Sequence, residues 1–386
     1  MAGVVNINVK TIKAQEGYVT VVWTNADGLG FQGYRVHAKP LIELASKARS
    51  ILHDFGDVYR APSPNFTNGI VQLAGIGREL REGLFTYYIS ADSAIARESL
   101  DWFNDVTATS PGVTITVAAD PILPLPWGLL SEANDSTPSI QLYSQFWALR
   151  FQVATTYNAM RPGAYRTSNR DGGPKLISAL DQVVFEKASG ALHRSQADII
   201  TSFLNRPVGK AFSSKGCRIR WKEVGNENCV IYFYGHATGR ELRFGESDAL
   251  SALSFRNIFR RESRQLSSGD KLSYVLSILN GCATVTGQES DGFLEATSDF
   301  GCCGFIGAEA IVPDQFAILF GHELLHLLIV EGLTVRAAMT KLWHKHEPMA
   351  LFYGCYAPPS ISVSQPQPGE LPPSFDSVNY HPGMAR

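Results

Sequence analysis

The sequence predicts an α/β protein with a mainly parallel sheet flanked by helices, preceded by an N-terminal α+β subdomain. Two apolar runs, residues 230–234 (VIYFY) and 274–279 (YVLSIL), support this prediction. Both have the length of a strand and neither alternates regularly with polar residues, which is typical of strands buried on both faces of a parallel sheet. From about residue 112 onward, segments typical of strands and of helices also follow one another, as they do in α/β folds.

Residues 1–110 mix strand and helix patterns and are expected to form a separate N-terminal subdomain. A regulatory role, in which this subdomain controls the rest of the chain, is one interpretation of it. Residues 19–23 and 34–37 are rich in β-branched and aromatic residues and predict strands. The apolar residues at positions 41, 44, 48 and 52 predict a helix over 40–55. A second apolar stripe predicts a helix over 69–85.

The rest of the chain is expected to contain the main sheet, within a domain spanning residues 111–357. Strands are predicted at 113–117, 218–222, 230–234, 274–279, 301–307 and 349–356. Residues 176–204 are expected to be mostly helical, and helices are also predicted after Asp314 and over 334–343. Residues 358–386 are rich in Pro, Ser and Gln and predict a flexible tail.

The composition indicates a folded chain and excludes some partners. Of the 386 residues, 45% are hydrophobic and 18% charged, so a sizeable core is available. The net charge of −2 gives no electrostatic reason to expect nucleic acid. The N-terminus lacks the pattern of a signal peptide, and no apolar run reaches the ~18 residues of a membrane helix. We therefore expect a cytoplasmic protein that binds neither nucleic acid nor a membrane.

The six cysteines do not indicate a disulfide framework or a structural zinc site. They are spread through a long chain and form no CxxC pair, so reduced thiols are expected. No cofactor is expected either. A cysteine at the end of a strand is more often a small packed hydrophobic residue than a nucleophile, so Cys282 needs support from its surroundings.

That support comes from the residues that follow the two buried runs. His236 comes just after the first run and Cys282 just after the second. Ligands of open α/β sheets bind at the carboxyl ends of the strands. If both strands end at one edge, the imidazole of His236 could activate the thiol of Cys282. A thiol with an activating base is the smallest set of catalytic residues that a cysteine protease needs.

The neighbours of these two residues also suit such a site. Gly235 and Gly281 leave room for a substrate backbone beside the two side chains. The backbone N–H groups of Cys282 and of the turn from Gly235 to Ala237 are candidate donors for an oxyanion hole.

Five segments, in order between residues 123 and 338, resemble the CHAT family of caspase-like peptidases. They are LPLPWGLL (123–130), VIYFYGHATG (230–239), LNGCAT (279–284), GFIGA followed by VPD (304–314) and GLTVRAA (332–338). Gly128 stands where the family usually has glutamate, and the TPR repeats that often accompany the family are absent from this sequence. The resemblance implies a caspase-like, clan CD fold with a Cys–His dyad formed by Cys282 and His236. It also implies a cysteine endopeptidase that cleaves a specific protein substrate, with a regulated role in bacterial antiviral defence or cell death and an activating partner protein.

The resemblance also bears on substrate specificity. Caspase-like enzymes often use an acidic residue to select Arg or Lys before the scissile bond. Acidic residues that flank the relevant strands are Glu289, Asp291, Asp299 and Glu309. An acidic residue in such a position is more often an ordinary solvated loop charge, so this assignment stays open.

A second motif, His322-Glu323-Leu-Leu-His326, matches the HExxH pattern of zinc peptidases. On a helix this spacing places two imidazoles on one face, with a glutamate available as a base. A catalytic zinc ion needs a third protein ligand, and Glu331 is too near in sequence for the usual downstream glutamate. His346 and Glu347 are conceivable third ligands. The alternatives to a cysteine peptidase are therefore a zinc metalloprotease and a catalytically silent, caspase-like interaction scaffold.

Overall fold

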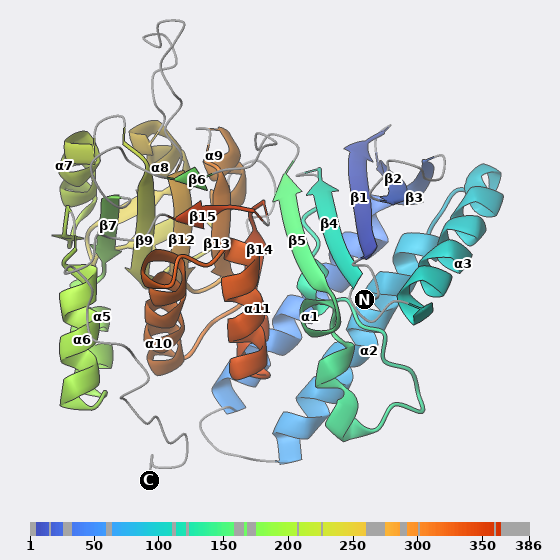
Figure 1. Cartoon of the computed structure of the whole chain (residues 1–386), viewed down its shortest axis with the longest axis horizontal. Coiled ribbons are helices and arrows are strands. Elements are labelled where there is room, and N and C mark those ends of the chain that lie inside the picture. The colour runs from blue at the N-terminus through green and yellow to red at the C-terminus, as the bar shows by residue number, and fades with distance from the viewer. Residues whose placement is uncertain are drawn as a thin grey trace, which may run out of the picture.

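The chain folds around two β-sheets that lie side by side (Figure 1). The computed structural model describes residues 5–14, 17–25, 33–58, 64–109, 113–120, 123–157, 166–167, 175–206, 208–224, 227–259, 275–285, 292–299, 302–358 and 360–363. The predicted tail beyond residue 363 lies outside these ranges. Within them, no helix is both long enough and apolar enough to cross a bilayer.

The first sheet has five strands in the order β3-β2-β1-β4-β5. Its strands are β1 (Val5–Lys13), β2 (Tyr18–Asn25), β3 (Tyr34–His37), β4 (Val113–Ala119) and β5 (Gln152–Tyr157). The first three form antiparallel pairs, and β4 and β5 extend the sheet in parallel. Alternate residues of β2 are buried, namely Val19, Val21 and Trp23, so this strand buries one face.

Three helices accompany the first sheet. They are α1 (Ala38–Val58), α2 (Pro64–Thr86) and α3 (Ser93–Thr109), and the first two cover the ranges predicted at 40–55 and 69–85. The ring of Trp23 stacks on Phe85 of α2 and meets Phe103 of α3 edge-on, with ring centroids 4.8 and 5.4 Å away. These aromatic contacts join the helices to the sheet.

The boundary expected at residue 110 does not coincide with the edge of this sheet. Because β4 pairs with β1, and β5 with β4, the first sheet continues to residue 157. The sequence pattern could not show this, because the parallel pairing joins segments about a hundred residues apart.

The second sheet has six strands in the order β14-β13-β12-β9-β7-β8. Its strands are β7 (Lys175–Leu180), β8 (Lys210–Ala211), β9 (Cys229–Gly235), β12 (Val275–Gly281), β13 (Gly304–Ala308) and β14 (Tyr353–Tyr356). All neighbouring pairs are parallel except β13 and β14. Every residue of β9 and β12 is buried, which confirms the prediction made from the two apolar runs.

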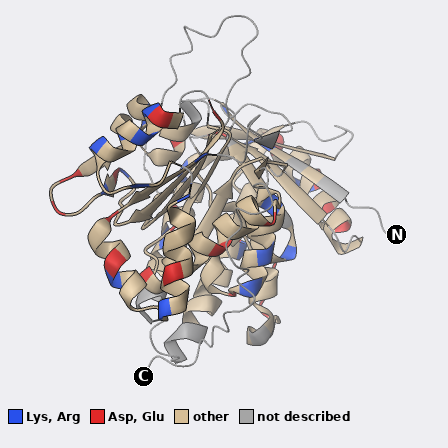
Figure 2. Ribbon diagram, turned by 60° about the vertical axis from the view of Figure 1, so that its left-hand side comes forward, with Lys and Arg blue, Asp and Glu red and all other residues tan. Residues whose placement is uncertain are grey.

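Helices lie on both sides of the second sheet, and Figure 2 shows charged residues mainly on helices and loops rather than within the strands. They are α5 (Gln182–Gly190), α6 (Arg194–Leu204), α7 (Ser214–Val224), α8 (Ala252–Phe259), α9 (Phe293–Asp299), α10 (Asp314–Leu325) and α11 (Val335–Lys345). The helix α10 continues as a π-helical turn, η6 (His326–Val330). The mixed α/β class expected from the sequence is confirmed.

Smaller elements complete the description. The short helix α4 (Trp147–Arg150) precedes β5, and two small ribbons pair β10 (Glu241–Arg243) with β11 (Ala249–Ser251) and β6 (Arg166–Thr167) with β15 (Ser362–Val363). Short 3₁₀ turns are η1 (Ser90–Asp92), η2 (Trp127–Leu129), η3 (Ser139–Gln141), η4 (Tyr143–Gln145) and η7 (Met349–Phe352).

Three local predictions differ from the structure, one of them fully and two in part. Residues 218–222 were expected to form a strand, but they lie within α7, whose buried residues Cys217 and Val224 are spaced as on one helical face. Residues 176–204 are mostly helical, as expected, but they begin with the strand β7, which was not predicted and which a single residue, Asp181, separates from α5. Residues 349–356 were expected to form a strand, but the first four form the 3₁₀ turn η7 and only β14 is a strand.

Candidate active site

The strands that precede His236 and Cys282 end next to each other. The strands β9 and β12 are parallel neighbours, and their register pairs Gly235 with Gly281 at the last position of each. Adjacent strands of a sheet lie about 4.8 Å apart. His236 and Cys282 are the next residues along the chain, so both leave the sheet from adjacent positions on its carboxyl edge. We call this edge, at the ends of β9 and β12, the rim.

Both glycines at the rim are required by close packing. Gly235 has a φ of +157°, and a Cβ atom there would run into the Cβ of Asp181. A Cβ atom on Gly281 would lie 2.6 Å from the Cβ of Ala237 and 2.9 Å from the carbonyl oxygen of Gly235. A larger residue at either position would therefore push the two turns apart.

Cys282 is the accessible thiol of this chain. All six cysteines lie in the described residues and are free; Cys282 is half-buried and the other five are buried. Burial raises the pKa of the Cys282 thiol, and the nearby carboxylate of Asp314 adds to this rise. The backbone N–H of Val312 hydrogen bonds the sulfur and opposes the rise. Without a base, the side chain is therefore mainly a thiol at neutral pH.

The turn that carries Cys282 has an unusual backbone. Ala283 adopts a φ of +54°, a conformation that residues with a Cβ atom rarely take. The turn is tied to the end of the neighbouring strand, because the N–H groups of Ala283 and Val285 donate to the carbonyl oxygens of Ala310 and Ala308, both at 3.0 Å. These bonds hold the strained residue next to the candidate nucleophile in place.

His236 is exposed at the start of a small hairpin. Its carbonyl oxygen accepts a hydrogen bond of 2.9 Å from the N–H of Arg243, and Ala237 pairs with Leu242. The side chains of His236 and Cys282, both among the described residues, are not hydrogen bonded to each other. Catalytic hydrogen bonds are often long without substrate and tighten when it binds, so this geometry does not exclude a dyad.

Two acidic residues of the rim were missed as site residues by the sequence analysis. Asp181 follows β7, caps α5 by accepting from the N–H groups of Val183 and Val184, and accepts from the N–H of Gly245 at 3.3 Å. Asp314 was expected only to precede a helix as its N-cap, but it is the first residue of α10, and Pro313 occupies the N-cap position. The half-exposed carboxylate of Asp314 lies close enough to Cys282 to affect the thiol and lies 4.0 Å from Nζ of Lys187.

The signal for Asp181 was a polar residue directly after an apolar run, as for His236 and Cys282. It was missed because residues 176–204 were expected to be mostly helical and the strand β7 was not predicted.

Of the four acidic residues expected to line a substrate pocket, only Glu309 has a side chain that the structure describes. Glu289 and Asp291 lie outside the described residues, and Asp299 ends α9 at a position whose side chain is not described. Glu309 is buried and accepts a hydrogen bond from Nε of Arg49 at 2.9 Å and another from the hydroxyl of Tyr356, so its carboxylate is engaged within the protein. Its partner Arg49 lies 260 positions away in the sequence, where no local pattern could reveal it.

The HExxH motif lies in α10 and η6, away from the rim. His322 is 2% exposed and its ring meets Phe203 edge-on. The carboxylate of Glu323 contacts one of the conceivable third ligands, with an oxygen 2.7 Å from Nε2 of His346, and accepts a hydrogen bond from Nζ of Lys345 at 3.0 Å. Among the described residues, no three His, Cys, Asp or Glu side chains are placed to share a metal ion. With its glutamate engaged and its first histidine packed in the core, the motif does not fit a catalytic zinc site.

Comparison with known proteins identifies the fold. No protein-family model matches the chain, so membership of the CHAT family is not confirmed, and no curated protein matches it in sequence. Among solved structures, two separase–securin complexes from Saccharomyces cerevisiae are similar, with TM-scores of 0.52 and 0.50 at 10% sequence identity. The chain has a caspase-like fold. The similarity covers 92% of this chain but only 30% of the separase chain, so the chain spans about a third of that protein's length.

Proposed function

We propose that this chain is a cysteine endopeptidase in which Cys282 is the nucleophile and His236 the general base. The observation that carries the proposal is the register of β9 and β12, because Gly235 and Gly281 pair and the reactive residues follow them directly. The caspase-like fold supports it, since ligands of open α/β sheets bind at this edge. The raised pKa of the Cys282 thiol supports the need for a base beside it.

The reaction would proceed in two stages. His236 takes the proton of the Cys282 thiol, and the sulfur attacks the carbonyl carbon of the scissile peptide bond to form a tetrahedral oxyanion. Backbone N–H groups at Cys282, Gly235 and Ala237 are the candidate donors for that oxyanion. When the C–N bond breaks, the imidazolium of His236 gives its proton to the leaving amine. Water, deprotonated by His236, then hydrolyses the thioester and releases the acid product.

The charges around Cys282 favour a basic residue before the scissile bond. Asp314 is partly exposed and its negative charge reaches the Cys282 sulfur. The carboxylate of Asp181 is buried and already accepts from three backbone N–H groups, so its charge contributes to the field without being free to contact a substrate directly. A cationic side chain beside Asp314 would be stabilised by this field.

The biological setting is proposed from the resemblance to CHAT peptidases. In that setting the chain would be a cytoplasmic bacterial protease that a partner protein regulates in antiviral defence or cell death. Six free cysteines suit a reducing compartment. The similar solved structures are complexes of separase with a second protein, securin, which fits regulation by a partner.

The alternative is a catalytically silent, caspase-like scaffold. One observation favours it, because the side chains of His236 and Cys282 are not hydrogen bonded to each other. The two proposals differ in whether Cys282 reacts with a carbonyl group.

The deciding experiment measures covalent trapping and peptide cleavage in parallel. The probes are a peptidyl chloromethyl ketone and a fluorogenic peptide, both with Arg before the reactive bond. Wild type should be labelled at Cys282 and should cleave the peptide, and Cys282→Ala should do neither. Cys303→Ala, which changes a buried thiol, is the matched control and should behave like wild type. Labelling of Cys282 no faster than that of a free cysteine in solution, with no cleavage, would favour the scaffold.

A further inference from the structure

The turn that carries Cys282 is held by residues 308–310, at and just beyond the end of β13. Besides the two backbone bonds to Ala283 and Val285, the N–H of Ala308 donates to the hydroxyl of Thr284 at 2.9 Å. The same hydroxyl donates to the carbonyl oxygen of Leu279 at 2.9 Å. The position of residues 308–310 therefore sets the position of the Cys282 turn.

Glu309 lies in the middle of this segment, and its side chain leaves the second sheet toward the first half of the chain. Its carboxylate is 2% exposed and pairs with Arg49 of α1, whose side chain is 12% exposed. Arg49 also donates to the carbonyl oxygen of Pro124 at 2.8 Å, so one guanidinium connects α1, the segment before η2 and the end of β13.

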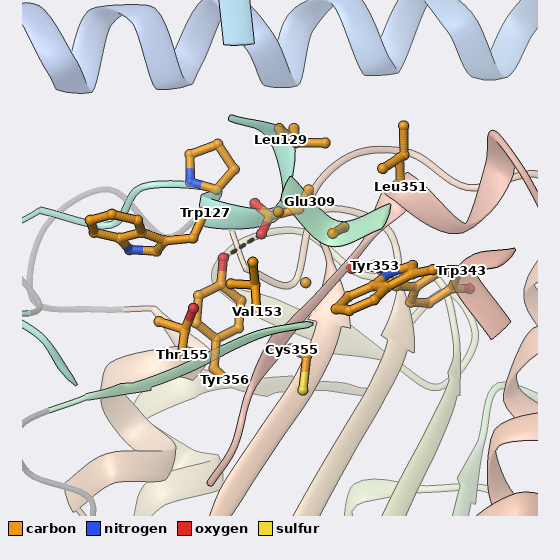
Figure 3. A pocket seen from close by; sticks show the side chains of 14 residues that line it. Trp127, Leu129, Val153, Thr155, Glu309, Trp343, Leu351, Tyr353, Cys355 and Tyr356 are labelled. Atoms are coloured by element: carbon orange, nitrogen blue, oxygen red, sulfur yellow. Dashed lines mark hydrogen bonds between the residues drawn. The ribbon is translucent and has the colours of Figure 1, made fainter. Parts of the chain in front are cut away.

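The surroundings of this ion pair are tightly packed. Figure 3 shows Glu309 hydrogen bonded to Tyr356 of β14, with Trp127 and Thr155 of the first half lining the same cavity. The cavity has a volume of only about 20 Å³. Because the interior there is nearly filled, a displacement of Arg49 cannot be absorbed locally and must move Glu309 and its neighbours.

We propose that Arg49 is a positioning residue for the Cys282 turn, and that the N-terminal half of the chain controls the reactivity of Cys282 through the Arg49–Glu309 pair. The proposal rests on the proposed peptidase function and names its means of regulation. Removing Arg49 leaves a buried carboxylate without its cation, which favours movement of Glu309 toward water. Ala308 and Ala310 would move with it, and the bonds that hold the strained Ala283 would weaken.

The test compares full-length Arg49→Met with Arg81→Met, a matched control. Arg81 forms a similarly buried ion pair with Glu132, with side chains 15% and 13% exposed, but this pair lies within the first half of the chain. Both variants should lose comparable stability in thermal unfolding. In the folded state at 20 °C, Arg49→Met should lower the rate of Cys282 alkylation by iodoacetamide, and kcat on the fluorogenic peptide, by about 10–100-fold with KM unchanged. Arg81→Met should leave both rates as in wild type.

Iodoacetamide reports on Cys282 because the other five cysteines are buried, and the labelled peptide is confirmed by mass spectrometry. If Arg49→Met does not fold, Glu309→Gln keeps the shape of the side chain and should show a smaller fall in both rates. Equal rates for wild type and the foldable variant, or equal losses in Arg49→Met and Arg81→Met, would overturn the positioning role. Alkylation does not require peptidase activity, so a wild type that cleaves no peptide would contradict only the proposed function.

Discussion

The rim and the helix α10 each carry a histidine in a sequence context found in peptidases, and the fold places them in opposite environments. His236 at the rim is exposed beside a half-buried thiol, whereas His322 in α10 is 2% exposed and packs against Phe203. The rim is where parallel strands end and their following residues reach solvent, while α10 is buried along nearly its whole length. A reactive residue type therefore indicates chemistry only where the fold gives that residue access to a substrate.

The largest difference between the two regions should appear in catalysis. His236→Ala removes the proposed base and should lower kcat/KM on the fluorogenic peptide by about 10²–10⁴-fold. His322→Leu changes only the core beneath the sheet and should leave kcat/KM unchanged at a temperature where the variant is folded. Steady-state kinetics of both variants at pH 7.5 would show this, with circular dichroism to confirm folding. Equal losses of kcat/KM in the two variants would mean that α10 contributes to catalysis as much as the rim does.

The next largest effect should be a loss of stability caused by a substitution in α10. A Cβ atom on Gly321 would meet the hydroxyl of Tyr232 and the amide of Asn280, which form one buried network with Tyr353. Gly321→Ala should therefore lower the free energy of unfolding by about 3 kcal/mol, measured by urea denaturation.

The matched control for Gly321→Ala is Gly75→Ala in α2, where a Cβ atom would meet nothing within 4 Å. That variant should be as stable as wild type or gain up to about 1 kcal/mol, because alanine favours a helix over glycine. A loss in Gly75→Ala as large as that in Gly321→Ala would show that the network is not responsible.

A smaller effect should appear as a dependence of the free energy of unfolding on pH, caused by His322. Burial, with the nearby His326 as a second cause, lowers the pKa of His322 to about 3, and the charge of Glu323 works against this shift. The unfolded chain binds a proton at this histidine below about pH 6.5, whereas the folded chain does not until about pH 3. The stability contributed by neutral His322 is thus complete above pH 6.5 and falls with decreasing pH, by up to about 1.4 kcal/mol per unit.

Between pH 6.5 and 5, wild type should therefore lose about 2 kcal/mol more than His322→Leu, in which the titrating group is absent. Urea denaturation of both proteins at the two pH values measures this difference. Parallel losses in the two proteins would mean that His322 does not titrate as its burial requires.

The sequence predicted the rim because its signal is local, and it failed where the deciding contact is distant. His236 and Cys282 each follow an apolar run. Because parallel strands end at one edge of a sheet, this pattern alone predicted that the two residues lie at the same edge. Five residues, 218–222, cannot distinguish an alternating strand from one turn of helix, so α7 was misassigned. The role of Glu309 depends on Arg49, which no pattern around residue 309 could reveal.

The smallest predicted effect tests how the rim is supported. Asp181 caps α5 and also holds Gly245, which lies in the hairpin that begins at His236. Asp181→Ala should lower the free energy of unfolding by about 1–2 kcal/mol and should also reduce kcat, because the hairpin loses its anchor. Thr334→Ala removes the cap of α11, whose hydroxyl accepts from the N–H of Ala337, and should cost similar stability.

Since Thr334 has no bond to the hairpin, kcat of Thr334→Ala should match that of wild type at 20 °C. A fall in kcat confined to Asp181→Ala would separate support of the rim from general stability. If both variants lost kcat in proportion to their stability, the carboxylate of Asp181 would act only as a helix cap, and the placement of His236 would depend on the strand register alone.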